Sequence, residues 1–324
     1  MISFDEDLSD STLSSAPSCP GRIKKFGHPL AYVCNAGDGT VSVIDLVDGV
    51  KLLDIPVGEG PSSYPYTIAL SPDNASAYVT TFNDGGISIL ELWQNKTVKT
   101  RVIGGNPAGV APSPNGLFIY VVLFSEPVLL VLDSRTLEEI QRIDLPAPGF
   151  QISVSESGAY AFITLHTEGQ TALVDLSLNT VLKVIETGAG AETVVFAPNG
   201  AFALVTGEDA NSLTPINTHL ALAGRSIPTG GRPVGLAFIR EGREFMVACR
   251  DDKAVYVYNV ATHREKARIE VGNGPYGLAV SKSRPLAVAG NQSDGTVSVI
   301  DIQTSSVTHT VGTGSLPVFM AILD

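Results

Sequence analysis

Cysteine, positive charge and long apolar runs are all scarce in this sequence, and each scarcity argues against a class of protein. The three cysteines, Cys19, Cys34 and Cys249, have neither the number nor the spacing of a disulfide framework or a zinc site. Lys and Arg number 21 against 33 Asp and Glu, which gives a formal net charge of −12. Because an acidic chain repels phosphate backbones and anionic lipids, we expect no nucleic acid and no membrane among its partners.

The apolar segments are short, and the start of the chain is polar. No stretch approaches the roughly 20 apolar residues that a membrane-spanning helix needs. The first ten residues are acidic and do not resemble a signal peptide, so we expect a cytoplasmic protein. Residues 1–28 are rich in Ser, Asp and Pro without periodicity, which predicts a disordered or loosely docked acidic arm. Residues 29–324 are predicted to form a single domain.

One octapeptide recurs along the chain at a regular interval. The letters DGTVSVID occupy residues 38–45 and again residues 294–301, and five degraded copies lie between them. Successive copies end 46 and then five times 42 residues apart, at Asp45, Glu91, Asp133, Asp175, Asn217, Asn259 and Asp301. Such a period indicates one supersecondary unit used seven times.

Each unit carries the signature of four short strands. In residues 107–146, apolar runs are separated by the turns Pro-Asn-Gly, Ser-Glu-Pro and Ser-Arg-Thr. Short antiparallel strands with a turn every several residues are typical of a propeller blade. The sequence therefore predicts an all-β, seven-bladed β-propeller with four antiparallel strands per blade. Pro215 lies inside the third strand of blade five, where we expect a bulge or a local break.

The two ends of the repeat are incomplete and complementary. The first unit begins at Ala31 with its second strand, and residues 316–323 form a lone first strand at the other end. Placing the C-terminal strand in the N-terminal blade completes the seventh sheet and removes an open edge. We therefore expect the ring to be closed by pairing of the two ends.

Residues 31–35 read AYVCN before the first octapeptide, and residues 77–81 read AYVTT before the second. Together with the Ser-Pro-Asp/Asn turns, these motifs resemble the YVTN-repeat family of β-propellers, over residues 31–324. The resemblance implies a seven-bladed, WD40-like propeller. The family includes surface-layer and secreted binding proteins, and similar repeats occur in seven-bladed lactonases. No lactonase catalytic set matches this chain residue by residue.

The segments that lead into the innermost strands differ most between units. The position after Pro or its substitute is occupied in turn by Tyr66, Ala108, Phe150, Glu192, Val234, Tyr276 and Val318. The next position is occupied by Thr67, Gly109, Gln151, Thr193, Gly235, Gly277 and Phe319. Gly is the commonest residue there and suits a crowded axis. Because departures from a repeat indicate local demands, we expect a pocket at the channel mouth.

Two ionisable side chains are the candidate catalytic residues. Glu192 is the sharpest departure, and a carboxyl near an apolar mouth can acquire a raised pKa and act as acid or base. The alternative is a solvated carboxylate, or one bound by nearby N–H groups. His166 is the only histidine expected on the same face, and can exchange protons near neutral pH. Its alternative is simple exposure to solvent.

The candidate ligand-binding residues surround this pair. Arg232 and Arg250 come from one blade and can clamp a carboxylate, although surface arginines that balance an acidic chain are the alternative. An insertion at residues 62–65 adds a tyrosine beside the mouth. The full set is Tyr64, Tyr66, Phe150, Gln151, Arg232, Arg250, Tyr276 and Phe319.

Motifs for metals, cofactors and nucleophiles are missing from the sequence. His28, His219, His263 and His309 are scattered without metal-ligand spacing. There is no nucleophile elbow, phosphate loop or dinucleotide fingerprint. The sequence therefore predicts no metal site and no cofactor.

Two functions remain open at this point. The first is binding of a small molecule or peptide at the central mouth, without catalysis. The second is an enzyme, namely a lactonase-like hydrolase, a lyase or a cyclase, that acts on a mid-sized organic substrate in the same pocket. The sequence leaves the oligomeric state open.

Overall fold

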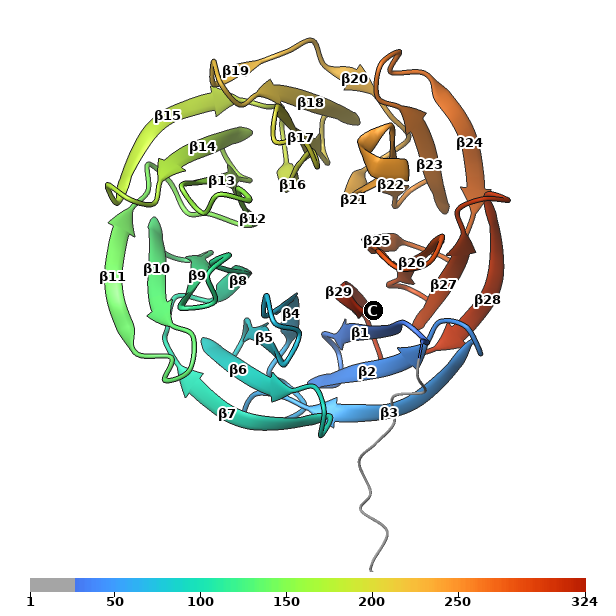
Figure 1. The fold of residues 1–324 in the computed structure, drawn as a ribbon, viewed down its shortest axis with the longest axis horizontal. Coiled ribbons are helices and arrows are strands. Elements are labelled where there is room, and N and C mark those ends of the chain that lie inside the picture. The colour runs from blue at the N-terminus through green and yellow to red at the C-terminus, as the bar shows by residue number, and fades with distance from the viewer. Residues whose placement is uncertain (1–26) are drawn as a thin grey trace, which may run out of the picture.

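Seven antiparallel sheets surround one axis as the blades of a propeller, in a computed structural model that describes residues 27–324 (Figure 1). Both the number of blades and the four strands per blade are as the repeat predicts. The expected arm at residues 1–28 lies outside the described residues, except for Gly27 and His28. Residues 27–324 include no helix with the length and hydrophobicity that crossing a bilayer would need.

The strands occupy four concentric positions. The innermost strands are β4 (Pro65–Leu70), β8 (Pro107–Pro112), β12 (Ile152–Val154), β16 (Ala191–Phe196), β21 (Pro233–Ile239), β25 (Pro275–Val280) and β29 (Pro317–Leu323). The second strands are β1 (Leu30–Asn35), β5 (Ser76–Thr81), β9 (Phe118–Leu123), β13 (Tyr160–Leu165), β17 (Phe202–Gly207), β22 (Glu244–Cys249) and β26 (Leu286–Asn291).

The third strands are β2 (Thr40–Asp45), β6 (Gly86–Glu91), β10 (Val128–Asp133), β14 (Gln170–Asp175), β18 (Ser212–Asn217), β23 (Ala254–Asn259) and β27 (Thr296–Asp301). The outer strands are β3 (Val50–Pro56), β7 (Lys96–Val102), β11 (Glu139–Asp144), β15 (Thr180–Glu186), the pair β19 (Leu222–Ala223) and β20 (Ile227–Pro228), β24 (Glu265–Glu270) and β28 (Ser306–Gly312). A 3₁₀ turn, η1 (Arg240–Gly242), joins β21 to β22.

The hydrophobic core lies between the blades. The second strands are apolar on both faces because each blade is covered by a neighbour on either side, and all six residues of β1 and of β22 are buried. One apolar cluster joins Met246 and Val257 of blade six to Ala287 and Ile300 of blade seven. The outer strands are largely exposed. The nearly continuous apolar runs of the sequence therefore follow from burial on two faces.

The ring is closed as the incomplete ends predict. Strand β29 pairs antiparallel with β1, with Leu30 opposite Leu323 and Tyr32 opposite Ala321. In Figure 1 the red C-terminal strand lies beside the blue β1 in one sheet. Both chain ends thus contribute to the first blade, and the innermost edge of that blade is filled.

The expected break at Pro215 occurs in the neighbouring strand. Strand β18 is continuous, and Pro215 pairs with Leu204 of β17. The Pro215 carbonyl accepts a hydrogen bond from Gly224 N at 2.7 Å, so its missing N–H also faces the outer strand. That outer strand is divided into β19 and β20. Because Pro215 cannot donate a hydrogen bond to the outer strand, that outer strand is interrupted, whereas β18 itself is continuous.

The residue that ends each third strand stabilises the turn that follows. The Asp133 carboxylate accepts hydrogen bonds from the backbone N–H groups of Arg135 and Thr136, at 2.9 and 2.7 Å. Asn259 accepts the equivalent bond from Thr262 N at 2.9 Å. Asn and Asp can do this equally because each offers a side-chain oxygen acceptor.

Candidate functional site

A bulge in the innermost strands places the variable residues at the axis. In β16, Ala191 pairs with Gly207 and Val194 with Val205, so the two intervening residues interrupt the register. The same irregularity occurs in β4, β8, β21, β25 and β29. Bulges redirect side chains, and in these six blades they direct the pairs of variable residues toward the centre. In blade four the corresponding pair, Phe150 and Gln151, precedes β12.

Threonines of the second strands hold three of these bulges. Thr164 Oγ1 accepts a hydrogen bond from Gln151 N and donates one to the Glu192 carbonyl, both at 2.9 Å. Thr80 and Thr206 make the equivalent pairs of bonds in blades two and five. These blades carry Thr67, Gln151 and Thr193 at the inner position. Those departures from Gly therefore accompany a threonine bridge that fixes the backbone.

Glycine at the inner position is required where blades approach each other closely. A Cβ added to Gly235 would lie 2.4 Å from the Tyr276 carbonyl oxygen, and one added to Gly277 would lie 2.3 Å from that of Val318. No side chain can be accommodated at such distances. The crowded axis expected from the sequence is therefore present in blades six and seven.

Aromatic rings from four blades meet at the axis. The ring centroids of Tyr66 and Tyr276 each lie 5.4 Å from that of Phe319, and the Phe150 ring lies 5.5 Å from Tyr66. The Tyr64 ring stacks on Tyr66 at 6.3 Å. The rings of Tyr66 and Tyr276 are buried. Together these residues form an aromatic floor for the channel mouth.

Glu192 is buried against this floor, with only 1% of its surface exposed. Its Oε1 accepts a hydrogen bond from the Tyr276 hydroxyl at 2.8 Å, and that hydroxyl lies 2.6 Å from the Tyr66 hydroxyl. Its Oε2 lies 3.4 Å from His166 Nε2. The two catalytic candidates therefore face each other, and Glu192 is not a solvated rim carboxylate.

A second ring of residues lies above the floor, at the first position after each second strand. Its members are Ala36, Phe82, Phe124, His166, Glu208, Arg250 and Gln292, mostly 42 residues apart. Neighbours in this ring contact one another. The Phe82 and Phe124 rings lie 5.5 Å apart, and Arg250 Nη2 donates to Gln292 Oε1 at 3.0 Å. One side of the mouth is thus apolar, and the other is charged.

Glu208 joins the charged residues and was not among the residues predicted from the sequence. Its Oε1 lies 2.7 Å from Arg232 Nη2 and 2.8 Å from Arg250 Nη1. Its Oε2 lies 3.7 Å from His166 Nε2. The Arg250 guanidinium also lies over the Tyr276 ring, at 5.1 Å from its centroid. Both predicted arginines therefore belong to the site, although they hold a carboxylate of the protein itself.

Burial and neighbouring charges shift the pKa values of the acidic groups. Burial, together with the nearby Glu208 charge, raises the pKa of Glu192 to about 7. Burial by itself would raise the pKa of Glu208, but His166, Arg250 and Arg232 lower it overall. The Glu208 carboxylate, helped by the charge of Glu192, raises the pKa of His166. Near neutral pH, Glu192 can therefore gain or lose a proton, and the raised pKa of His166 favours its protonated form.

The predicted residues fall into one connected group with one exception. Tyr64, Tyr66, Phe150, Tyr276 and Phe319 form the aromatic floor described above. Gln151 is turned away from Glu192, and its Nε2 donates to Thr67 Oγ1 at 2.8 Å. It joins blade four to blade two next to the axis, and makes no hydrogen bond to the charged residues.

Three groups in the mouth offer ligand atoms that a metal ion could share. One atom each from His166, Glu192 and Glu208 lies within 4.8 Å of the others. No spacing in the sequence predicts this cluster, because its members come from different repeats. Arg232 and Arg250 already supply two positive charges to Glu208. We therefore treat the cluster as a proton-sharing and ion-paired group.

Two family models match parts of the chain. The model described as the Cytochrome D1 heme domain matches residues 28–164, and the model described as a YNCE-like beta-propeller matches residues 162–285. Each match covers less than half of the 324 residues. They agree with the expected propeller, under descriptions other than the YVTN repeat. No curated protein matches the chain significantly.

Solved structures share the fold at low sequence identity. A functionally unknown protein from Desulfotomaculum acetoxidans matches with a TM-score of 0.79 and 17% identity, over 90% of this chain and 98% of its own. Kuenenia stuttgartiensis hydrazine synthase matches with 0.73 and 18%, over 87% and 98%. The dihydro-heme d1 dehydrogenase NirN in complex with DHE matches with 0.68 and 19%, over 92% and 66%. These likenesses establish the fold.

The residues at the mouth do not fit a haem group. Haem iron takes a His, Cys, Met or Tyr ligand. The only histidine in the matched residues 28–164 is His28, whose Nδ1 lies 2.9 Å from Asp45 Oδ2. At the mouth, His166 Nε2 faces two carboxylates, and the buried Tyr66 and Tyr276 hydroxyls are hydrogen-bonded to each other and to Glu192. We therefore derive no chemistry through haem.

Proposed function

We propose that the protein binds a small organic molecule, or the end of a peptide, through an anionic group and an apolar body at the channel mouth. The observation that carries this proposal is the division of the second ring. Phe82 and Phe124 lie on one side, and His166, Glu208 and Arg250 lie on the other. Binding sites for small molecules typically combine an apolar wall with a few convergent polar groups.

The charge of the mouth favours an anion. Arg232 and Arg250 are permanent cations, and the side chains of Arg232 and His166 are 44% and 29% exposed. Glu208 is the ionised acid at their centre, whereas the raised pKa of Glu192, about 7, keeps that carboxyl largely protonated below neutrality. Counted over these side chains alone, the positive charges therefore outnumber the negative ones in a chain that is acidic overall, and the charge of Asp209 also acts on His166. A ligand carboxylate would find guanidinium N–H donors beside an aromatic wall.

Calorimetric titration with a panel of aromatic monocarboxylates, from benzoate to naphthoate, tests this proposal. We expect the wild type to bind at least one of them with a 1:1 stoichiometry. Arg250→Gln should weaken that binding by about tenfold or more, since a charge-assisted bond is lost. Arg225→Gln, which removes one exposed charge from blade five, should leave it unchanged. Equal affinities for wild type and Arg250→Gln would exclude the mouth as the site.

A second candidate function is acid–base catalysis in the same mouth. It is favoured by Glu192, which combines burial, a pKa of about 7 and a distance of 3.4 Å to His166 Nε2. Proton transfer is most effective when the pKa of the group lies near the working pH. Turnover of a panel of lactones and esters by wild type and Glu192→Gln tests it. Loss of turnover in the variant would support catalysis, and equal rates would exclude Glu192 as the acid or base.

A further inference from the structure

A separate cavity lies between blades two and three, on the face opposite the mouth. Strand β4 begins at the mouth with Pro65 and Tyr66 and ends at Leu70, directly before Ser71, which lines the cavity. The cavity has a volume of about 470 Å³ and is lined from both blades by residues that include Tyr78, Ile89, Lys99, Leu117 and Arg135. Cavities of roughly 300–1,000 Å³ are large enough for small molecules.

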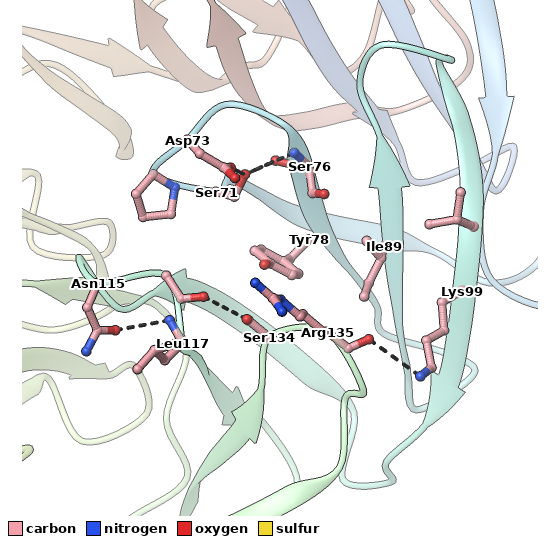
Figure 2. Close-up of a pocket in the computed structure, with 13 residues that line it drawn as sticks. Ser71, Asp73, Ser76, Tyr78, Ile89, Lys99, Asn115, Leu117, Ser134 and Arg135 are labelled. Carbon is pink, nitrogen blue, oxygen red and sulfur yellow. Dashed lines mark hydrogen bonds between the residues drawn. The ribbon is translucent and has the colours of Figure 1, made fainter.

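Two cations face this cavity without a direct ion pair to a carboxylate among the described residues. Figure 2 shows Arg135 directed toward the Tyr78 ring, with Lys99 on the neighbouring strand β7. Lys99 Nζ contacts the backbone carbonyl of Arg135 at 3.5 Å. Within the part of the chain that the structure describes, neither side chain forms an ion pair with a carboxylate within 4.0 Å. This is unexpected in a chain with a net charge of −12.

The two carboxylates nearest to these cations are occupied by their own turns. Asp73 Oδ1 accepts hydrogen bonds from Ser71 Oγ at 2.6 Å and from Ala75 N at 3.0 Å. Asp133 Oδ1 accepts the N–H groups of Arg135 and Thr136. Asp73 itself lines the cavity, and the charges of both acids attract the Arg135 guanidinium. Neither carboxylate forms an ion pair with Lys99 or Arg135 within 4.0 Å, so the N–H donors of both cations carry no carboxylate among the described residues.

A comparison of the repeats shows that an aromatic residue with two cations occurs in only one of the grooves between neighbouring blades. Every pair of neighbouring blades presents positions equivalent to Tyr78, Lys99 and Arg135. The other grooves carry Tyr120, Gln141 and Ser177; Phe162, Lys183 and His219; Leu204, Arg225 and Ala261; Met246, Ala267 and Gln303; Val288, His309 and Val47; and Tyr32, Leu53 and Trp93. Only the groove between blades two and three has two permanent cations. The fold itself does not require them, so a local function accounts for them better.

We propose that this cavity binds an organic anion whose apolar or aromatic body lies against Tyr78, Ile89 and Leu117 and whose charged group lies between Lys99 and Arg135. The apolar residues supply a surface for the body of the ligand. The guanidinium of Arg135 suits a planar or tetrahedral oxyanion, since it donates two parallel hydrogen bonds. This site does not rest on the proposed function of the mouth, which is formed by other residues on the opposite face.

Calorimetric titration with phenyl phosphate tests the proposal. We expect the wild type to have a site for phenyl phosphate that is weakened about tenfold or more by Arg135→Gln and by Lys99→Gln. Arg225→Gln is the charge-matched control and should bind as the wild type does. Arg250→Gln alters the mouth and should keep this site, even where it removes separate binding of the aromatic anion at the mouth. Inorganic phosphate should bind at least tenfold more weakly, because it lacks the aromatic body.

Four results would overturn the proposal. They are the absence of binding up to about 10 mM phenyl phosphate, equal binding by wild type and Arg135→Gln, loss of binding in Arg250→Gln, and equal affinity for inorganic phosphate. The third would assign the anion to the mouth. The fourth would show that the cavity binds only the charge of the anion and makes no use of the aromatic body. Circular dichroism and the thermal midpoint of each variant establish that it is folded before it is compared.

Discussion

Glu192 illustrates at the scale of one residue how a repeat can be adapted. Its backbone carbonyl is held by Thr164 as the scaffold requires, and its side chain takes a place that is apolar in four of the other six blades. Burial disfavours the charged form, whereas the Tyr276 hydroxyl and His166 favour it. The balance leaves a protonated carboxyl at a pH where most acids are ionised.

This balance predicts that the protein loses stability as pH rises through the region where Glu192 titrates. Its folded-state pKa, about 7, lies above its ordinary value. The folded state therefore binds more protons than the unfolded state between about pH 4.5 and 7, and the free energy of unfolding falls across that window. His166, whose pKa is also raised, acts in the same direction.

Glu192→Gln should remove part of this dependence. Glutamine keeps an acceptor for the Tyr276 hydroxyl but cannot ionise, so the variant should gain stability relative to wild type between pH 5 and pH 8. Urea denaturation at the two pH values measures the difference. An identical pH dependence for the two proteins would show that Glu192 has an ordinary pKa.

At the scale of elements, the threonine of a second strand and the bulge of the innermost strand act together. Thr164 satisfies a buried N–H and a buried carbonyl with one hydroxyl. Val122, Ala248 and Gly290 occupy the same position in the blades that carry Gly109, Gly235 and Gly277. The hydroxyl is thus present in three of the four blades whose inner residue has a side chain, and blade one, with Phe319, has Cys34 at this position.

Thr164→Val should therefore destabilise the protein by roughly 2–4 kcal/mol, because it leaves two buried backbone groups without partners at nearly constant volume. Chemical denaturation measures this loss. Thr218→Val is a suitable control, since Thr218 Oγ1 bonds the Gly200 carbonyl at 2.6 Å in an exposed turn, where water can replace it. The control should change stability by less than about 0.5 kcal/mol. Equal effects of both substitutions would contradict the role of the bridge.

Strand β29 is the element on which closure depends. Its residues Val318, Met320 and Leu323 are buried, and burying side chains of this size contributes roughly 1.5–3 kcal/mol each. Deleting residues 317–324 should cost about 5 kcal/mol or more and abolish a cooperative thermal transition. Deleting residues 1–10, which lie outside the described residues, should retain the transition. Similar melting curves for the two truncations would contradict closure by β29.

The elements whose residues recur in every repeat could be predicted from the sequence. Octapeptide period, turn residues and complementary ends predicted the blades and the closure, because every blade obeys the same packing rules. The break caused by Pro215 was expected in the third strand of blade five but occurs in the neighbouring outer strand. A proline residue shows that a donor is missing but does not show which neighbouring strand needed it.

At the scale of the whole molecule, departures from the repeat indicated most of the charged residues at the mouth. The acidic composition of the chain concealed one of them. Glu192, His166, Arg232 and Arg250 stood out because they broke a pattern. Glu208 escaped notice because one more Glu in an acidic chain is unremarkable by type. Its position was informative, since it lies 42 residues after His166 and 42 before Arg250. Side-chain contacts between blades, such as that of Glu208 with both arginines, require the three-dimensional arrangement.

The ring as a whole presents two different faces. One carries the mouth with its aromatic floor, and the other carries the cavity beside Tyr78. The central claim is that irregular residues of a regular scaffold mark the mouth as the main binding site. The nine tyrosines of the chain report on it, because Tyr64, Tyr66 and Tyr276 lie at the mouth and the others lie elsewhere.

The most direct measurement is the ¹⁹F NMR spectrum of the protein labelled with 3-fluorotyrosine, recorded during titration with the panel of aromatic carboxylates. Single Tyr→Phe substitutions assign the resonances. The account predicts that ligands of the panel shift the resonances of Tyr64, Tyr66 and Tyr276 and that Arg250→Gln reduces these shifts. A panel that leaves all three resonances in place, or that shifts only tyrosines outside the mouth, would contradict it.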